Sequence, residues 1–190
     1  MTRQEWDRLA VEMSTCTACG LAGSRQRVVP GQFPPGARVL LVGEAPGREE
    51  DEGGEPFVGR SGRLLDELLA EVGLDRGDMA VVNTVKCRPP ANRPPRRGEA
   101  ATCRPWLDSQ VLAVDPAIVV TLGGSALAWA FGPGRRLRDV RGRVHSDLLA
   151  GRALVATYHP SAALRFGPAG EPRAALRDDL ALVAGLLETA

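Results

Sequence analysis

The sequence predicts an α/β protein of three layers, in which a central parallel sheet of four strands lies between layers of helices. Two observations support this prediction. Apolar runs typical of strands alternate along the chain with helical patterns, as they do in parallel sheets covered on both faces. In addition, the runs at residues 39–42 (Val-Leu-Leu-Val) and 118–120 (Ile-Val-Val) contain no polar residue, which is typical of strands buried on both faces.

The predicted elements follow one another in regular order. Trp6, Leu9, Ala10 and Met13 recur at helical spacing, so a short amphipathic helix is expected over residues 3–14. Strands are expected at residues 38–43, 80–85, 117–122 and 153–158. Helices are expected at residues 62–72, 99–114, 125–131 and 172–187. Because the chain contains no internal repeat and no convincing linker, we expect residues 1–190 to form one domain.

The composition is that of an ordinary globular protein. Hydrophobic residues make up 44% of the 190 residues and charged residues 25%, and the formal net charge is +1. No apolar run approaches the roughly 20 residues that cross a bilayer, and the first residues do not resemble a signal sequence. We therefore expect a cytoplasmic protein that does not contact a membrane, and we expect it to be a monomer.

The charges are unevenly distributed. Acidic residues gather at Glu44 and between Glu49 and Glu55. Arginines gather in two groups, Arg88, Arg93, Arg96, Arg97 and Arg104, and Arg135, Arg136, Arg138, Arg141 and Arg143. Such patches bind phosphates even when the total charge is near zero. Lys86 is the only lysine, a bias typical of GC-rich coding, and each patch taken alone is more simply explained as a solvated face.

Chemically useful groups follow each predicted strand. Glu44 comes after the first strand and Asn83 lies at the second, a Gly-Gly-Ser loop starts at Gly123, and His159 comes after the fourth. Because ligands collect at the carboxyl ends of parallel strands, we expect these groups to converge on one edge of the sheet. An Asn amide both donates and accepts, as reading the edge of a base requires. Pro160 constrains the backbone beside His159, so that its ring can be aimed at one oxygen.

A second loop presents Phe57 between Pro56 and Gly59. Pro and Gly suffice to turn a chain, so an exposed aromatic near Glu44 favours a pocket that stacks a flat ring. Each residue also has a simpler explanation. Phe57 could fill a gap in the core, Asn83 could cap a turn, and His159 could be a satisfied buried polar group.

The four cysteines are Cys16, Cys19, Cys87 and Cys103. Disulfides are rare in cytosolic proteins. A Cys-x2-Cys pair followed by two later thiols fits a four-thiolate metal site that closes the N-terminal arm onto the domain. Spacing alone does not distinguish zinc from an iron–sulfur cluster, and four unrelated core cysteines are the simpler alternative.

Several of these segments together resemble the family 4 uracil-DNA glycosylases, the iron–sulfur members of the uracil-DNA glycosylase superfamily. They are Gly-Glu-Ala-Pro-Gly at 43–47, Pro-Phe-Val-Gly at 56–59, Asn-Thr-Val-Lys-Cys-Arg-Pro-Pro at 83–90, Asn92-Arg93, and His-Pro-Ser at 159–161. The likeness runs from about Cys16 to the C-terminal helix and includes all four cysteines. No single motif decides it, but the order and spacing of the segments are specific.

The resemblance implies a repair enzyme that flips uracil out of single- or double-stranded DNA and hydrolyses its N-glycosidic bond, leaving an abasic site. It implies that this enzyme is monofunctional and belongs to base excision repair. It also implies a [4Fe-4S] cluster on Cys16, Cys19, Cys87 and Cys103 that is structural, with zinc as the alternative.

Roles for individual residues follow from the same resemblance. Phe57 would stack on the flipped uracil, Asn83 would bind its polar edge and discriminate it from cytosine, and His159 would donate to uracil O2. Glu44, with the backbone of Ala45 and Gly47, would line the pocket and help to hold or activate the attacking water.

The resemblance implies less direct roles for other residues. Glu50 is a further acidic position near the pocket. Residues 161–165, from Ser161 to Arg165, would form a loop that enters the minor groove, where Leu164 fills the space left by the base and Arg165 touches a phosphate.

Two alternatives come from the same superfamily. One is a non-catalytic iron–sulfur protein that binds DNA damage. The other is a branch that traps uracil-DNA covalently through a basic insertion with a second His. Residues 88–97 are short, rich in Pro and free of His, which argues against trapping, and His145 is expected to be structural or on the surface.

Overall fold

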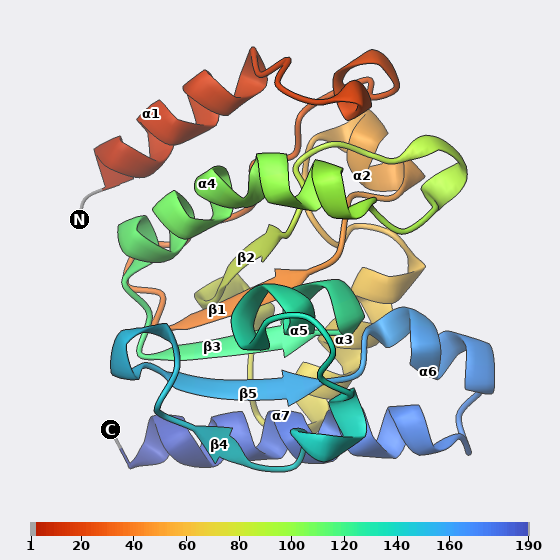
Figure 1. The fold of residues 1–190 in the computed structure, drawn as a ribbon. Coiled ribbons are helices and arrows are strands. Elements are labelled where there is room, and N and C mark those ends of the chain that lie inside the picture. The colour runs from red at the N-terminus through yellow and green to blue at the C-terminus, as the bar shows by residue number, and fades with distance from the viewer. Residues whose placement is uncertain (1–2, 190) are drawn as a thin grey trace.

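The computed structural model describes residues 3–189, which are arranged around one five-stranded sheet (Figure 1). The strand order is β2-β1-β3-β5-β4. The strands are β1 (Val39–Gly43), β2 (Ala80–Asn83), β3 (Ile118–Leu122), β4 (Val144–His145) and β5 (Ala153–Thr157). The pairs β1–β2, β1–β3 and β3–β5 are parallel, which confirms the four predicted parallel strands. The sheet also has an edge strand outside the four predicted ones, because β4 is antiparallel to β5 and only two residues long, in a segment around His145 whose sequence suited a strand or a loop.

Seven α-helices surround the sheet within residues 3–189. They are α1 (Arg3–Ser14), α2 (Arg48–Gly53), α3 (Arg60–Glu71), α4 (Arg97–Val114), α5 (Gly124–Phe131), α6 (Pro160–Phe166) and α7 (Glu171–Glu188). The short helix α2 was not predicted, because its sequence Arg-Glu-Glu-Asp-Glu-Gly has no apolar stripe. The prediction of a loop over residues 161–165 was wrong. Pro160 occupies the first turn of α6, where its missing N–H is tolerated, and the helix runs on to Phe166.

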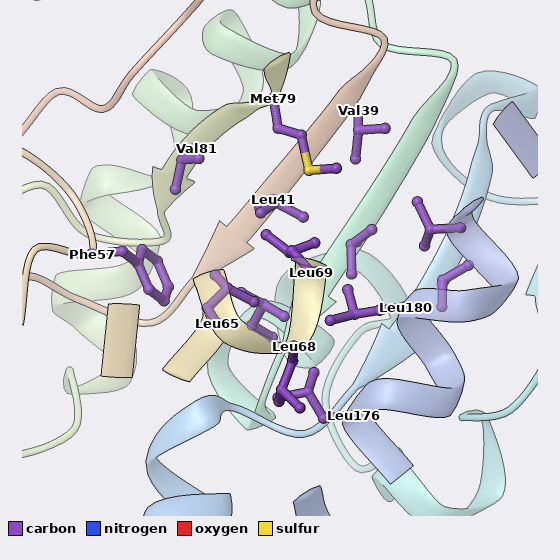
Figure 2. Close-up of a cluster of buried hydrophobic side chains, with 14 of the residues drawn as sticks. Val39, Leu41, Phe57, Leu65, Leu68, Leu69, Met79, Val81, Leu176 and Leu180 are labelled. Carbon is purple, nitrogen blue, oxygen red and sulfur yellow. The ribbon is translucent and has the colours of Figure 1, made fainter. Parts of the chain in front are cut away.

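Each face of the sheet is covered by its own set of helices, which confirms the predicted three layers. Alternate strand residues point to opposite faces, so Leu41 and Val120 pack with α3 and α7, whereas Leu40 and Val119 pack with α1, α4 and α5. Figure 2 shows the first cluster, with Leu65 and Leu68 of α3 against the sheet and Phe57 beside the tip of β1.

The register of the sheet brings the ends of the parallel strands to one edge. Gly43 at the end of β1 pairs with Asn83 at the end of β2, and Leu122 of β3 pairs with Thr157 of β5. The loops that follow all four strands therefore leave from the same edge, where α/β sheets bind ligands. Among the helices of residues 3–189, none combines the length and the apolar character that a membrane span requires.

Candidate active site

A cavity of about 600 Å³ opens at this edge of the sheet. Its walls come from the loops that follow β1, β2, β3 and β5 and from the segment before α3. Glu44, Phe57, Asn83 and His159 all line it. The residues that the sequence places at four separate points of the chain thus share one cavity, which we call the main cavity.

Phe57 is buried, with 5% of its surface exposed, and not exposed as the sequence suggested. Its ring belongs to the core cluster beneath α3 and at the same time lines the main cavity, so both sequence interpretations describe part of its surroundings. Its centroid lies 5.8 Å from that of His159, with 32° between the ring planes. Its backbone φ of 56° is unusual for a residue other than Gly, and Arg76 Nη1 donates to its carbonyl oxygen at 2.7 Å.

Gly43 provides the space that Phe57 and Asn83 occupy. A Cβ atom at Gly43 would lie 2.6 Å from the Phe57 ring and would also contact the side-chain oxygen of Asn83. Such contacts are too close for any side chain without displacement of its neighbours. The absence of a side chain at the end of β1 is therefore part of the geometry of the cavity.

Asn83 ends β2 and is 3% exposed. The turn that follows it is fixed to the loop after β1, because the backbone N–H of Thr84 donates to the oxygen of Gly43 at 3.0 Å and Thr84 Oγ1 donates to the Glu44 carbonyl at 2.6 Å. Lys86 Nζ donates to the carbonyl oxygen of Asn83 at 2.6 Å. The backbone that positions the Asn83 amide is therefore held from two sides.

The hydrogen bonds of His159 define where its proton lies. The backbone N–H of Ser161 donates to Nδ1 at 3.1 Å, and Ser161 Oγ lies 2.8 Å from the same nitrogen. Burial lowers the pKa of His159 to about 4, so the ring is neutral at physiological pH. Because Nδ1 accepts the backbone N–H, the single ring proton is on Nε2. His159 is thus a neutral donor held at the N-cap of α6, beside the main cavity.

Glu44 has a partner that sequence reasoning did not single out. Ser125 Oγ donates to Glu44 Oε2 at 2.6 Å, across 81 positions of sequence. Ser125 lies in the first turn of α5, in the small-residue loop that the sequence marked without assigning it a role. The bond fixes the carboxylate and leaves Oε1 for other partners. No sequence signal short of the tertiary fold links these two residues.

Glu50 lines the main cavity, yet the protein itself occupies both of its carboxylate oxygens. Oε2 accepts the backbone N–H of Gly47 at 3.0 Å, and Oε1 accepts that of Gly59 at 2.8 Å. Glu50 therefore joins the loop after Glu44 to the loop after Phe57. Its geometry is that of a brace between two walls of the cavity, and not that of a free carboxylate facing a ligand.

The first residues of α6 border the main cavity, whereas its last turn faces solvent. Ser161 lines the cavity. Leu164, with 37% exposed, and Arg165 lie outside its lining. The aromatic residue Phe166 is 65% exposed. Sequence reasoning did not single out this exposed apolar residue.

Many of the grouped arginines have acidic partners. Arg93 forms a bidentate pair with Glu99, at 2.6 and 2.8 Å, which lowers the pKa of Glu99 to about 2. Arg93 and Arg88 also line the main cavity. In the second group, Arg136 pairs with Asp139, and Arg141 pairs with Asp179. Of the two beside the cavity, Arg93 is thus held by Glu99, whereas Arg88 donates to the neutral side chain of Asn92 and is the better placed to meet a ligand.

The four cysteines all line a second, small cavity, which we call the thiol cavity. Cys87 and Cys103 are buried, and Cys16 and Cys19 are half-buried. Burial raises the pKa of the Cys87 thiol to about 11, and Arg25 Nη1 donates to its sulfur at 3.4 Å. Within residues 3–189, no group of three or more His, Cys, Asp or Glu side chains has the arrangement that would hold a metal ion. Four thiols on one cavity are a donor set that both a zinc ion and an iron–sulfur cluster use.

Comparison with known proteins agrees with this fold and site. The family model of the Uracil DNA glycosylase superfamily matches residues 30–181, so the chain belongs to this superfamily. The chain is 43% identical over 166 residues to a Type-4 uracil-DNA glycosylase of Thermotoga maritima, covering 86% of both chains. It is 44% identical over 159 residues to that of Pyrobaculum aerophilum, covering 80% of this chain and 81% of the other.

A Type-5 uracil-DNA glycosylase of Thermus thermophilus is 35% identical over 153 residues, covering 71% of this chain and 69% of the other. The Type-4 relatives are thus more similar, at 39–44% identity over most of the chain. The chain belongs to the type-4 uracil-DNA glycosylase family, as the sequence motifs predicted.

Proposed function

We propose that this protein is a DNA repair enzyme that excises uracil by hydrolysing its N-glycosidic bond and leaves an abasic site. The observation that supports this most directly is the placement of Phe57, Asn83 and His159 around one cavity at the carboxyl edge of the sheet. The type-4 relatives, whose names give the same activity, support it independently.

In this proposal the base is recognised by the Phe57 ring and the Asn83 amide, which both line the main cavity. A uracil flipped out of DNA would stack on the face of Phe57, which its backbone and Gly43 hold in place. The Asn83 amide would accept from N3–H and donate to O4. Cytosine presents an acceptor and an amino group at the same positions, so it would leave the buried amide mismatched, which is costly.

His159 would assist departure of the base. Cleavage of the glycosidic bond leaves negative charge on uracil O2, and a neutral imidazole with its proton on Nε2 is a preorganised donor for that charge. Proton transfer is not required, because hydrogen bonding to the developing anion lowers the barrier. Glu44, held by Ser125, would orient the water that attacks the sugar carbon as positive charge develops there.

We further propose that Cys16, Cys19, Cys87 and Cys103 hold a [4Fe-4S] cluster. The four thiols line one cavity, the cationic side chains of Arg25 and Lys86 lie beside them, and the chain belongs to the type-4 family. When bound, the group would supply a structural cross-link and no step of base removal. Zinc remains the alternative, and a monomeric, cytoplasmic protein remains a prediction.

Incubation with a uracil-containing oligonucleotide tests the proposed function. The enzyme should release free uracil and leave alkali-labile sites, with no change to the matched thymine-containing strand. DNA binding without release of uracil would favour the non-catalytic damage-binding protein. A protein–DNA adduct that survives denaturation would favour the covalent branch instead.

A further inference from the structure

Lys86 is a buried lysine that has no role in the proposed recognition and cleavage of the base. It is the only lysine of the chain, and 2% of its surface is exposed. Burying an ammonium group is costly unless it is paired and hydrogen-bonded. Nζ donates to the carbonyl oxygen of Asn83 at 2.6 Å, which satisfies one of its three hydrogens.

The titratable groups that lie beside Lys86 are thiols of the thiol cavity. Lys86 lines the thiol cavity together with Cys87 and Cys103. The backbone of Lys86 is also hydrogen-bonded to the side-chain sulfur of Cys103. Thiolates are the metal-ligating form of cysteine, so an occupied site would give the buried ammonium its counter-charge.

The backbone of Lys86 connects the N-terminal segment, which carries Cys16 and Cys19, to the loops around the main cavity. The N–H of Val29 donates to the Lys86 carbonyl at 2.8 Å, which joins the N-terminal segment to this turn. On the other side, the turn is bonded to the loop of Glu44 through Thr84. One side chain and one short turn therefore connect the thiol cavity to the residue proposed to recognise the base.

We propose that Lys86 is a positioning residue that couples the thiol cavity to base recognition. Its ammonium serves the thiolates as counter-charge and at the same time fixes the carbonyl of Asn83, so that the Asn83 amide faces the uracil edge correctly. This inference rests on the proposed function and on the proposed cluster, and it assigns to Lys86 no contact with the substrate.

Three variants separate the two tasks of Lys86. Lys86→Met removes the charge and the donor, whereas Lys86→Gln removes the charge and keeps an N–H donor. Arg25→Met is the matched control, because Arg25 also lies beside Cys87 but its bond ends at the sulfur. All three are purified anaerobically with their cluster. The measurements are the midpoint potential of the cluster, hydrogen exchange at the amides of Thr84 and Val85, and the single-turnover rate of uracil release.

All three variants should shift the potential to more negative values, because a lost positive charge disfavours the added electron. Only Lys86→Met should speed exchange at Thr84 and Val85, and it should lower the single-turnover rate by about tenfold with substrate affinity nearly kept. Lys86→Gln and Arg25→Met should lose less of the rate.

Equal rates and equal exchange in Lys86→Met and Arg25→Met would overturn the positioning role. An unchanged potential in Lys86→Gln would overturn the role as counter-charge, even if Lys86→Met fails to fold. A wild-type chain that releases no uracil would overturn the proposed function alone, because the potential and the hydrogen exchange require no substrate.

Discussion

A neutral His159 ring has one proton to offer, and the Ser161 backbone N–H determines that it resides on Nε2. We predict that His159→Ala lowers the single-turnover rate of uracil release by about 10²–10³-fold, the loss typical of removing one preorganised donor. DNA affinity should be nearly unchanged, because the lost interaction strengthens only as charge develops on the base. Rapid-quench kinetics with enzyme in excess, together with a filter-binding titration, measure both. An unaltered rate would remove His159 from the mechanism.

The same residue makes stability depend on pH. Burial lowers the pKa of His159 from 6.5 to about 4, so between these values the unfolded chain binds a proton that the folded chain does not. Acid therefore favours unfolding, and this contribution grows as the pH falls from 6.5 towards 4. In His159→Asn, where Asn is also a good N-cap, the contribution is absent. Urea titrations give the unfolding free energy of wild type and of variant at each pH. The wild-type value minus the variant value should thus decrease as the pH is lowered from 6.5 to 4. A difference independent of pH would contradict it.

At the scale of elements, the end of β1 shapes the main cavity because Gly43 has no side chain. We predict that Gly43→Ala displaces Phe57 and Asn83, because the added methyl group would overlap both. Overpacking of this kind costs about 1–3 kcal/mol of stability. Displacing reacting groups by about 1 Å costs about 10²-fold in rate. Gly98→Ala in α4, where no heavy atom lies within 4 Å of the new Cβ, is the control and should retain full activity. Equal activity of the two variants would contradict this.

Helix α6 follows His159 directly and exposes Leu164. If Leu164 fills the gap left by the flipped base, its loss should matter most where a base must be unpaired. We predict that Leu164→Ala slows excision from double-stranded DNA by about tenfold and has little effect on single strands. Leu112→Ala is the control, because Leu112 is exposed near the end of α4, at the opposite edge of the sheet. The ratio of the two rates, from parallel assays on both substrates, gives the result, and an equal slowing on both would argue against a wedge.

What the sequence could predict at this scale follows from pattern and periodicity. The four parallel strands are short apolar runs, and the five longer helices have helical patterns of apolar residues, so both were recognisable. The helix α2 is charged throughout, and α6 begins with His-Pro-Ser, which also suits a turn. The convergence of Glu44, Asn83 and His159 was predictable because strand ends share an edge. The bond of Ser125 to Glu44 was not, because it joins segments 81 positions apart. The bond of Lys86 to Asn83 spans only three positions, but it depends on the burial of a lysine, a residue type that is almost always exposed.

At the scale of the whole molecule, several contacts hold the N-terminal arm, and two of them differ in whether they involve the thiols. Trp6 of α1 packs with Leu107 of α4 in the core cluster on that face of the sheet. The thiol cavity joins Cys16 and Cys19 to the turn after β2 and to α4. Of these two, only the second would depend on the proposed metal group. When the metal group is removed, we therefore expect the cysteine-containing part of the arm to loosen and helix α1 to stay packed.

We predict that protein purified without oxygen is brown and contains about four iron atoms per chain. Removing the iron with a chelator should increase hydrogen exchange and protease cleavage in residues 15–29 and 84–93, because the cross-link between them is lost. Helix α1 should stay protected, since Trp6 remains 4% exposed in a core that contains no thiol. Cys103→Ser should show the same pattern before any chelator is added. A colourless protein with one zinc per chain would reject the iron–sulfur assignment, and exchange that rises equally in α1 would show that the arm is held as one unit.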